Sequence, residues 1–80
     1  MTNLKALELA FDIMKAHNEL TGFETFKDIE INPIDDYVAF DVPTFALGAA
    51  DMICSLLNLT LHIEVNSDPT DDRQLNYYIN

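Results

Sequence analysis

Two pairs of neighbouring acids are the first positions at which this sequence could carry chemistry. Asp35-Asp36 and Asp71-Asp72 each end a Pro-x-Asp-Asp segment. Adjacent turn residues point apart, and neither segment has the alternating oxygen ligands or the Gly of a calcium loop. Asp in turns also makes local backbone hydrogen bonds. We therefore expect solvated turn acids here rather than a metal site or a catalytic carboxylate pair.

Other reactive side chains are too scattered to form a site. His62 and Glu64 share one strand face, but a zinc site needs three or four well-placed ligands. His17 lies on a distant segment, and Cys54 falls on an apolar helix side, where a buried thiol is expected. Ser55 has no His at a plausible spacing, and a chain with two Gly has no glycine-rich phosphate loop. The sequence predicts no enzyme, no metal and no cofactor.

Charge is the most unusual property of the chain. It carries 14 acidic against 4 basic residues, a net charge of −10 over 80 residues. Such a surface repels nucleic acid and anionic lipid, so we expect no direct nucleic-acid or membrane binding and a basic protein partner. The 49% hydrophobic content indicates one folded domain spanning residues 1–80. Charged residues near the N-terminus interrupt any signal sequence, which favours the cytoplasm of the cell or of an infected host.

The longest apolar stretch, residues 42–66, must organise the fold. Val42-Pro43 suits the start of a helix, which we expect over residues 44–57. From residue 59 the apolar positions alternate, which predicts a strand with one face buried. Asp51 near the centre would cost about 2.5 to 3.5 kcal/mol in a bilayer, so a membrane span is disfavoured.

The remaining segments complete an α+β fold. A first helix, capped by Thr2 or Asn3, should end at Thr21-Gly22. Strand patterns follow at 23–31, clearest at the end of that segment, and at 37–41 and 74–79. Lys27 falls on the apolar side of its strand, which suggests a bulge or a sheet edge. We expect the order αββαββ, with a four-stranded antiparallel sheet and two helices packed on one face.

An offset of 36 residues relates the two halves of the chain. It aligns the polar stripes of the two helices and superimposes the two Pro-x-Asp-Asp segments. Two agreeing features predict a duplicated αββ unit, with pseudo-repeats at 1–40 and 41–80. The two hairpin tips would then be related by a pseudo-twofold axis.

The sheet face away from the helices is the best candidate for binding. Carboxylates can replace phosphates in pairing with Arg, and Tyr supplies contact area at low entropic cost. An ordinary solvated face is the alternative. The predicted partner-binding residues lie on this face and on the hairpin tips: Asp28, Glu30, Tyr37, Asp41, Glu64 and Tyr78, with Asp35, Asp36, Asp71 and Asp72.

These features favour a small inhibitor or nucleic-acid mimic, of the anti-defence kind that phages and mobile elements encode. It would block a basic groove on a DNA- or RNA-handling protein. The alternative is an acidic homodimeric interaction protein, such as an immunity protein, an antitoxin or a small structural subunit. Both expected helices have narrow polar stripes, so surplus apolar surface is available for such an interface. Salt sensitivity would separate the two hypotheses.

Overall fold

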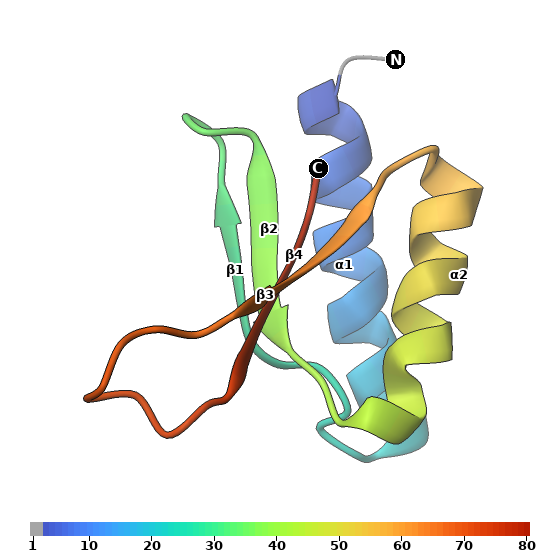
Figure 1. Ribbon diagram of the computed structural model, residues 1–80. Helices are drawn as coiled ribbons and strands as arrows, with labels where there is room; N and C mark the ends of the chain where they lie inside the picture. Colours follow the sequence, from blue (N-terminus) through green and yellow to red (C-terminus); the bar gives the residue numbers. More distant parts are fainter. Residues whose placement is uncertain (1–2) are drawn as a thin grey trace.

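A computed structural model, which describes residues 3–80, has two helices packed on one face of a four-stranded antiparallel sheet (Figure 1). This confirms the predicted fold class and the αββαββ order. The suggestion that Thr2 caps the first helix lies outside the described residues. The elements in chain order are α1 (Asn3–Thr21), β1 (Lys27–Asn32), β2 (Tyr37–Asp41), the 3-10 turn η1 (Thr44–Ala46), α2 (Leu47–Leu57), β3 (Leu61–Val65) and β4 (Leu75–Ile79).

The strand order in the sheet is β1-β2-β4-β3, so β2 and β4 are central and β1 and β3 form the edges. In the central pair Val38 lies opposite Ile79, and Phe40 lies opposite Tyr77. Because β2 and β4 are antiparallel, the two hairpin tips lie at opposite ends of the sheet (Figure 1). A pseudo-twofold between β2 and β4 would give this order. The helices have 19 and 11 residues, and the duplication stays a prediction.

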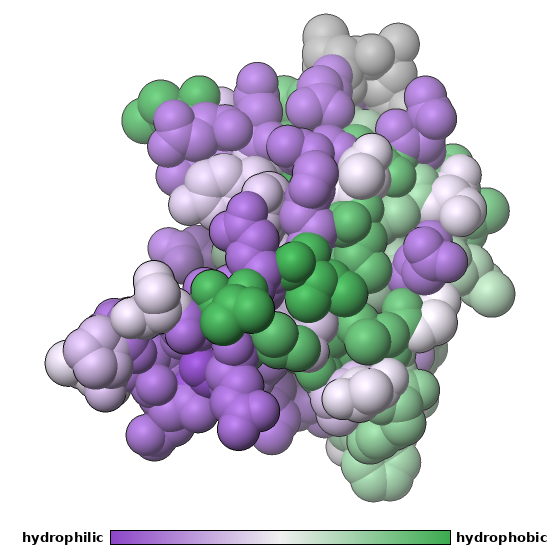
Figure 2. All heavy atoms as spheres, viewed as in Figure 1, coloured by the Kyte–Doolittle hydropathy of each residue, from purple (hydrophilic) through white to green (hydrophobic). Residues whose placement is uncertain are grey.

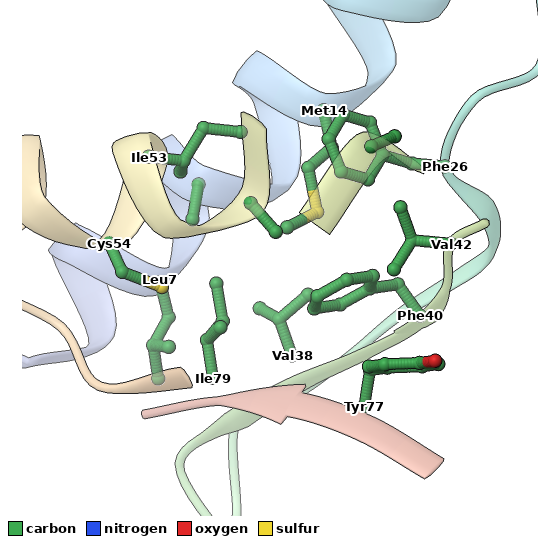
Figure 3. Close-up of a cluster of buried hydrophobic side chains, with 13 residues drawn as sticks. Leu7, Met14, Phe26, Val38, Phe40, Val42, Ile53, Cys54, Tyr77 and Ile79 are labelled. Atoms are coloured by element: carbon green, nitrogen blue, oxygen red, sulfur yellow. The ribbon is translucent and has the colours of Figure 1, made fainter. Parts of the chain in front are cut away.

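The core fills the space between the sheet and the helices (Figure 3). The inward side chains of β2 and β4 alternate as predicted, and Val38 and Ile79 are fully buried. They meet Leu7 on α1 and Cys54 on α2 within one apolar cluster. Burial raises the pKa of the Cys54 thiol to about 11, with the nearby Asp51 carboxylate as a lesser cause. Cys54 is therefore a core residue, as expected.

Two predicted elements begin later than their sequence patterns suggested. The segment at 44–57 starts with the 3-10 turn η1 before α2 begins at Leu47. The strand expected from residue 23 begins only at Lys27. Asn18 on α1 explains the delay, because its side-chain amide donates to the Phe26 carbonyl at 2.7 Å and accepts from the Phe26 N–H at 3.0 Å. These bonds satisfy the backbone at Phe26 and anchor its ring in the core.

Positive φ values mark four points in the described backbone, one of which is Asp36 (φ 55°) in the β1–β2 turn. Gly22 (φ 73°) ends α1 as predicted, whereas Asn58 (φ 56°) ends α2 in the same left-handed conformation. In β1 the register with β2 shifts between Lys27 and Glu30, and Asp28 has φ 51°. This shift confirms the bulge suggested by the placement of Lys27. The bulge lies on an edge strand, where such irregularities are common.

The prediction that β3 has one buried face is wrong for most of the strand. Leu61 is half-buried, but Ile63 is 47% exposed and Val65 is 80% exposed. Both side chains point to the helix side, since each lies in register with an inward residue of β4. β3 is an edge strand, and α2 has little contact with it.

Neither helix of the described chain has the length and apolar character needed to cross a membrane.

Candidate binding site on the open face of the sheet

The sheet face opposite the helices, here called the open face, is built by strand alternation. Cross-strand register places Glu30, Ala39, Tyr78 and His62 in one line across β1, β2, β4 and β3. Side chains opposite one another in an antiparallel sheet share a face. The outward residues of the four strands include Glu30, Asn32, Tyr37, Ala39, His62, Glu64, Asn76 and Tyr78.

A hollow of about 510 Å³ lies on the open face. Ala39 helps to create it, because a methyl group stands where the neighbouring outward positions carry long or aromatic side chains. The hollow combines carboxylates, aromatic rings and an amide around this small residue. Its lining consists of Asp28, Glu30, Tyr37, Ala39, Phe40, Glu64, Arg73, Asn76, Tyr77 and Tyr78.

An aromatic row crosses the open face. The Tyr78 ring stacks on His62 with centroids 4.7 Å apart and an interplanar angle of 10°. Tyr37 meets Tyr78 edge to face at 6.1 Å. The outer members are also held by amides, since Asn32 Nδ2 donates to the Tyr37 hydroxyl at 3.3 Å and His62 Nε2 lies 2.7 Å from Asn80 Oδ1. These contacts restrict ring rotation, which lowers the entropic cost of binding against the row.

One carboxylate of the hollow is oriented by this row. The Tyr78 hydroxyl donates to Glu64 Oε1 at 2.9 Å. The hydrogen bond, with a smaller contribution from the negative charge of Glu64, raises the pKa of Tyr78. Glu64 retains its second carboxylate oxygen for another donor, because this bond uses only Oε1.

A single cationic side chain also lines the hollow. Arg73 Nε lies 3.2 Å from both carboxylate oxygens of Asp71, and Nη2 lies 2.9 Å from Oδ2. The Arg73 side chain and backbone N–H together lower the pKa of Asp71 to about 2. The pKa of Arg73 is raised chiefly by Asp71, with smaller effects from Asp41 and Asp28. Arg73 therefore brings positive charge to the rim of an otherwise acidic hollow.

Half of the predicted partner-binding residues converge on this hollow. These five residues come from all four strands and include both tyrosines: Asp28, Glu30, Tyr37, Glu64 and Tyr78. Strand alternation brings Glu30, Tyr37, Glu64 and Tyr78 to one face, whereas Asp28 lies in the bulge of β1.

The other five predicted acids do not line the hollow. Asp35 and Asp36 lie in the β1–β2 turn, while Asp71 and Asp72 lie in the β3–β4 loop at the opposite end of the sheet. Asp71 already pairs with Arg73. Asp41 is in register with Lys27 on β1, and its carboxylate accepts the N–H of Val42 at 3.0 Å. The two Asp pairs therefore do not form one acidic patch.

Sequence reasoning missed five lining residues of the hollow as binding candidates: Ala39, Phe40, Arg73, Asn76 and Tyr77. Ala39 has a readable signal, since it is a small outward residue between Tyr37 and Asp41 on one strand. Asn76 also follows from alternation on β4. Arg73 had no comparable signal, because its position depends on the path of the β3–β4 loop and on the Asp71 pair.

Comparisons with known proteins add no family assignment: no family model, curated protein or solved structure matches this chain. Within residues 3–80, no group of three or more His, Cys, Asp or Glu side chains is placed to hold a metal ion. The open-face hollow therefore stands as the candidate site on its own geometry.

Proposed function

We propose that this protein is a non-catalytic acidic binding protein that blocks a basic groove on a DNA- or RNA-handling protein. It would act as an inhibitor or nucleic-acid mimic of the kind carried by phages and mobile elements. The observation that carries the proposal is the open-face hollow, where three carboxylates surround a row of ordered aromatic rings. The net charge of −10 supports a basic partner and a fast, electrostatically steered encounter.

The acids of the hollow are spread across the width of the sheet. Glu30 lies on edge strand β1 and Glu64 on edge strand β3, with β2 and β4 between them. Three strand spacings separate the two backbones by about 14 Å. Carboxylates that enter the hollow from opposite sheet edges suit several cationic side chains along one groove.

The contacts of Arg73 indicate that an arginine side chain of the partner would fit the hollow. Its guanidinium already forms a forked pair with Asp71 at the rim and feels the charge of Asp28. A partner arginine entering the hollow would find Glu30 and the free oxygen of Glu64, with Tyr rings for stacking. Such forked, partly desolvated contacts with aromatic neighbours are typical of binding hot spots.

The test is a pull-down from lysate of the native host with matched acid variants. The first variant replaces the hollow acids (Asp28→Asn, Glu30→Gln, Glu64→Gln), and the second replaces the turn acids (Asp35→Asn, Asp36→Asn). We expect the hollow variant to lose affinity for the captured protein by at least ~100-fold, since charge-assisted bonds are removed. The turn variant should stay within a few-fold.

The identity of the captured protein decides whether the partner is a nucleic-acid-handling protein. A nucleic-acid enzyme that is released by high salt or by competing DNA supports the proposal. A partner that resists salt and binds both variants equally contradicts it.

One observation favours the second candidate, an acidic interaction protein that uses apolar helix faces. Met52 and Leu56 on α2 are 65% and 74% exposed, beyond what the polar stripe of this helix predicts. An interface on these residues would keep its affinity at high salt. Replacing both with Gln would weaken it, whereas the hollow acid variant would not.

A further inference from the structure

The free edge of β3 presents backbone groups that no strand of residues 3–80 pairs with. β3 pairs with β4 on one side, and no strand within residues 3–80 pairs with the other. Thr60 and Asn66 direct their N–H groups to Asn80 and Gln74 beside β4. By the alternation of an antiparallel ladder, the N–H and C=O groups of the odd positions Leu61, Ile63 and Val65 therefore point to the free edge.

The two sheet edges differ in protection. β1 is interrupted by the bulge at Asp28 and begins with Lys27, and both features discourage edge pairing. β3 reads Leu-His-Ile-Glu-Val and has a continuous register with β4, without a bulge, Pro, Gly or Lys. It is therefore the sheet edge suited to accept another strand.

An uncovered apolar strip accompanies this edge on the helix side. Val65 is 80% exposed there and Ile63 is 47% exposed. Figure 2 shows hydrophobic atoms extending from the position of β3 toward α2. A partner on this edge would thus satisfy backbone groups and cover apolar side chains together.

We propose that β3 pairs with β3 of a second copy of this chain, antiparallel, with Ile63 opposite Ile63 of the second copy. This register pairs the whole strand, so Leu61, Ile63 and Val65 each donate and accept one backbone hydrogen bond. The twofold axis is perpendicular to the sheet, so each side chain stays on its own face. The result is a continuous sheet twice as wide as the four-stranded one.

Side-chain complementarity selects this register. On the helix side, Leu61 of one copy lies beside the exposed Val65 of the other, and the two Ile63 side chains meet. On the open face, His62 lies beside Glu64 of the second copy, so an imidazole faces a carboxylate. A shift of one strand by two residues also keeps each side chain on its own face of the sheet. It places either Glu64 opposite Glu64 or His62 opposite His62, and it forms fewer residue pairs. Like charges directly opposite one another are destabilising.

The same operation brings the helix layers together on one side of the extended sheet. α2 packs against β3 more closely than α1 does, so the two α2 helices approach the dimer axis. This inference does not rest on the proposed groove binding, and it places self-association on the strand edge rather than on the helices alone.

The first test is sedimentation equilibrium of the full chain over micromolar to millimolar concentrations. We expect a monomer–dimer equilibrium for the wild type, and Ile63→Lys should weaken it by at least ~100-fold because two charges enter the contact. Ile34→Lys is the matched control, since Ile34 is 90% exposed on the distant β1–β2 turn and should leave dimerisation unchanged. A monomer at all concentrations, or a dimer indifferent to Ile63→Lys, overturns the proposal.

A proline variant separates dimer loss from unfolding. The Ile63 N–H is not used inside the monomer, so Ile63→Pro should keep the circular dichroism spectrum and lose the dimer. The register between the two β3 strands is tested by introducing single cysteines and oxidising mildly. The native Cys54 is buried and should not form a disulfide. Ile63→Cys should give disulfide-linked dimers, and Val65→Cys should give few, because Val65 faces Leu61 of the second copy. Equal cross-linking of both variants contradicts this register.

Discussion

The hydroxyl of Tyr78 on β4 is hydrogen-bonded to Glu64 Oε1 on β3 at a distance of 2.9 Å. The two residues are diagonal neighbours, since Tyr78 lies directly opposite His62 and Glu64 opposite Asn76. The bond links the aromatic row to one of the hollow carboxylates. It also has a titration signature that can be measured without a partner.

Tyr78 should ionise at higher pH than an ordinary tyrosine. The pKa is raised above 10.0 because ionisation breaks the hydrogen bond to Glu64 and creates a second negative charge beside it. Since the folded-state pKa is the higher one, this contribution to stability is present below pH 10 and is lost as the pH rises through the folded value. Ultraviolet absorbance of tyrosinate should show the Tyr78 step moving to lower pH in Glu64→Gln. Glu30→Gln should leave that step in place.

Asp71 should stay ionised to a lower pH than an ordinary aspartate. Hydrogen bonds from the side chain and backbone of Arg73 hold its pKa at about 2, against an ordinary 3.8. A depressed folded-state pKa contributes stability that is present above pH 3.8 and lost as the pH falls through about 2. In Arg73→Gln the pKa should rise toward 3.8, as followed by carboxyl carbon NMR. Asp72→Asn should not shift it, and an unchanged Asp71 in Arg73→Gln would contradict the pairing.

The two glycines should respond in opposite directions to alanine. Gly22 has φ 73°, so Gly22→Ala should cost about 1 kcal/mol from left-handed strain. Gly48 lies in α2 with open space where a Cβ would stand, so Gly48→Ala should stabilise by about 0.5 kcal/mol. Urea denaturation measures both. Shifts of the same sign would show that one of these local conformations is wrong.

Leu7 should be among the most costly side chains to truncate. It is fully buried between α1 and the sheet, and Leu7→Ala should lose about 2 to 5 kcal/mol. That is a large part of the stability of a domain this small. Leu56→Ala, at a position 74% exposed, should change the unfolding free energy by less than about 0.5 kcal/mol at a concentration where the protein is monomeric. Similar losses in both variants would contradict the core assignment.

The periodicity of apolar residues in the sequence was sufficient to predict the α+β class and the αββαββ order. The alternation at 37–41 and 74–79 placed Val38 and Ile79 inside and Tyr37 and Tyr78 outside, as the structure has them. Gly22 as a helix end and a bulge near Lys27 were also readable, because each depends on local conformational preference. The convergence of Glu30 and Glu64 on one hollow followed from the same alternation, whereas Asp28 lies in the bulge.

What the sequence could not supply depends on tertiary neighbours. The strand at 23–31 starts late because Asn18, on another element, binds the backbone at Phe26. β3 was expected to be buried on one face, but periodicity does not say whether a helix reaches that face. The Asp71–Arg73 pair and the separation of the two Asp-Asp turns follow from loop path and strand order. None of these is encoded in a residue pattern of fixed period.

The bulge at Asp28 determines how far self-pairing can proceed. When β3 of one copy has joined β3 of another, both outer margins of the widened sheet are β1 strands. Each is interrupted at Asp28 and carries Lys27, so neither offers a regular ladder to a third copy. Growth stops at a closed pair with one twofold axis, and an acidic chain rich in exposed apolar residues avoids becoming a fibre.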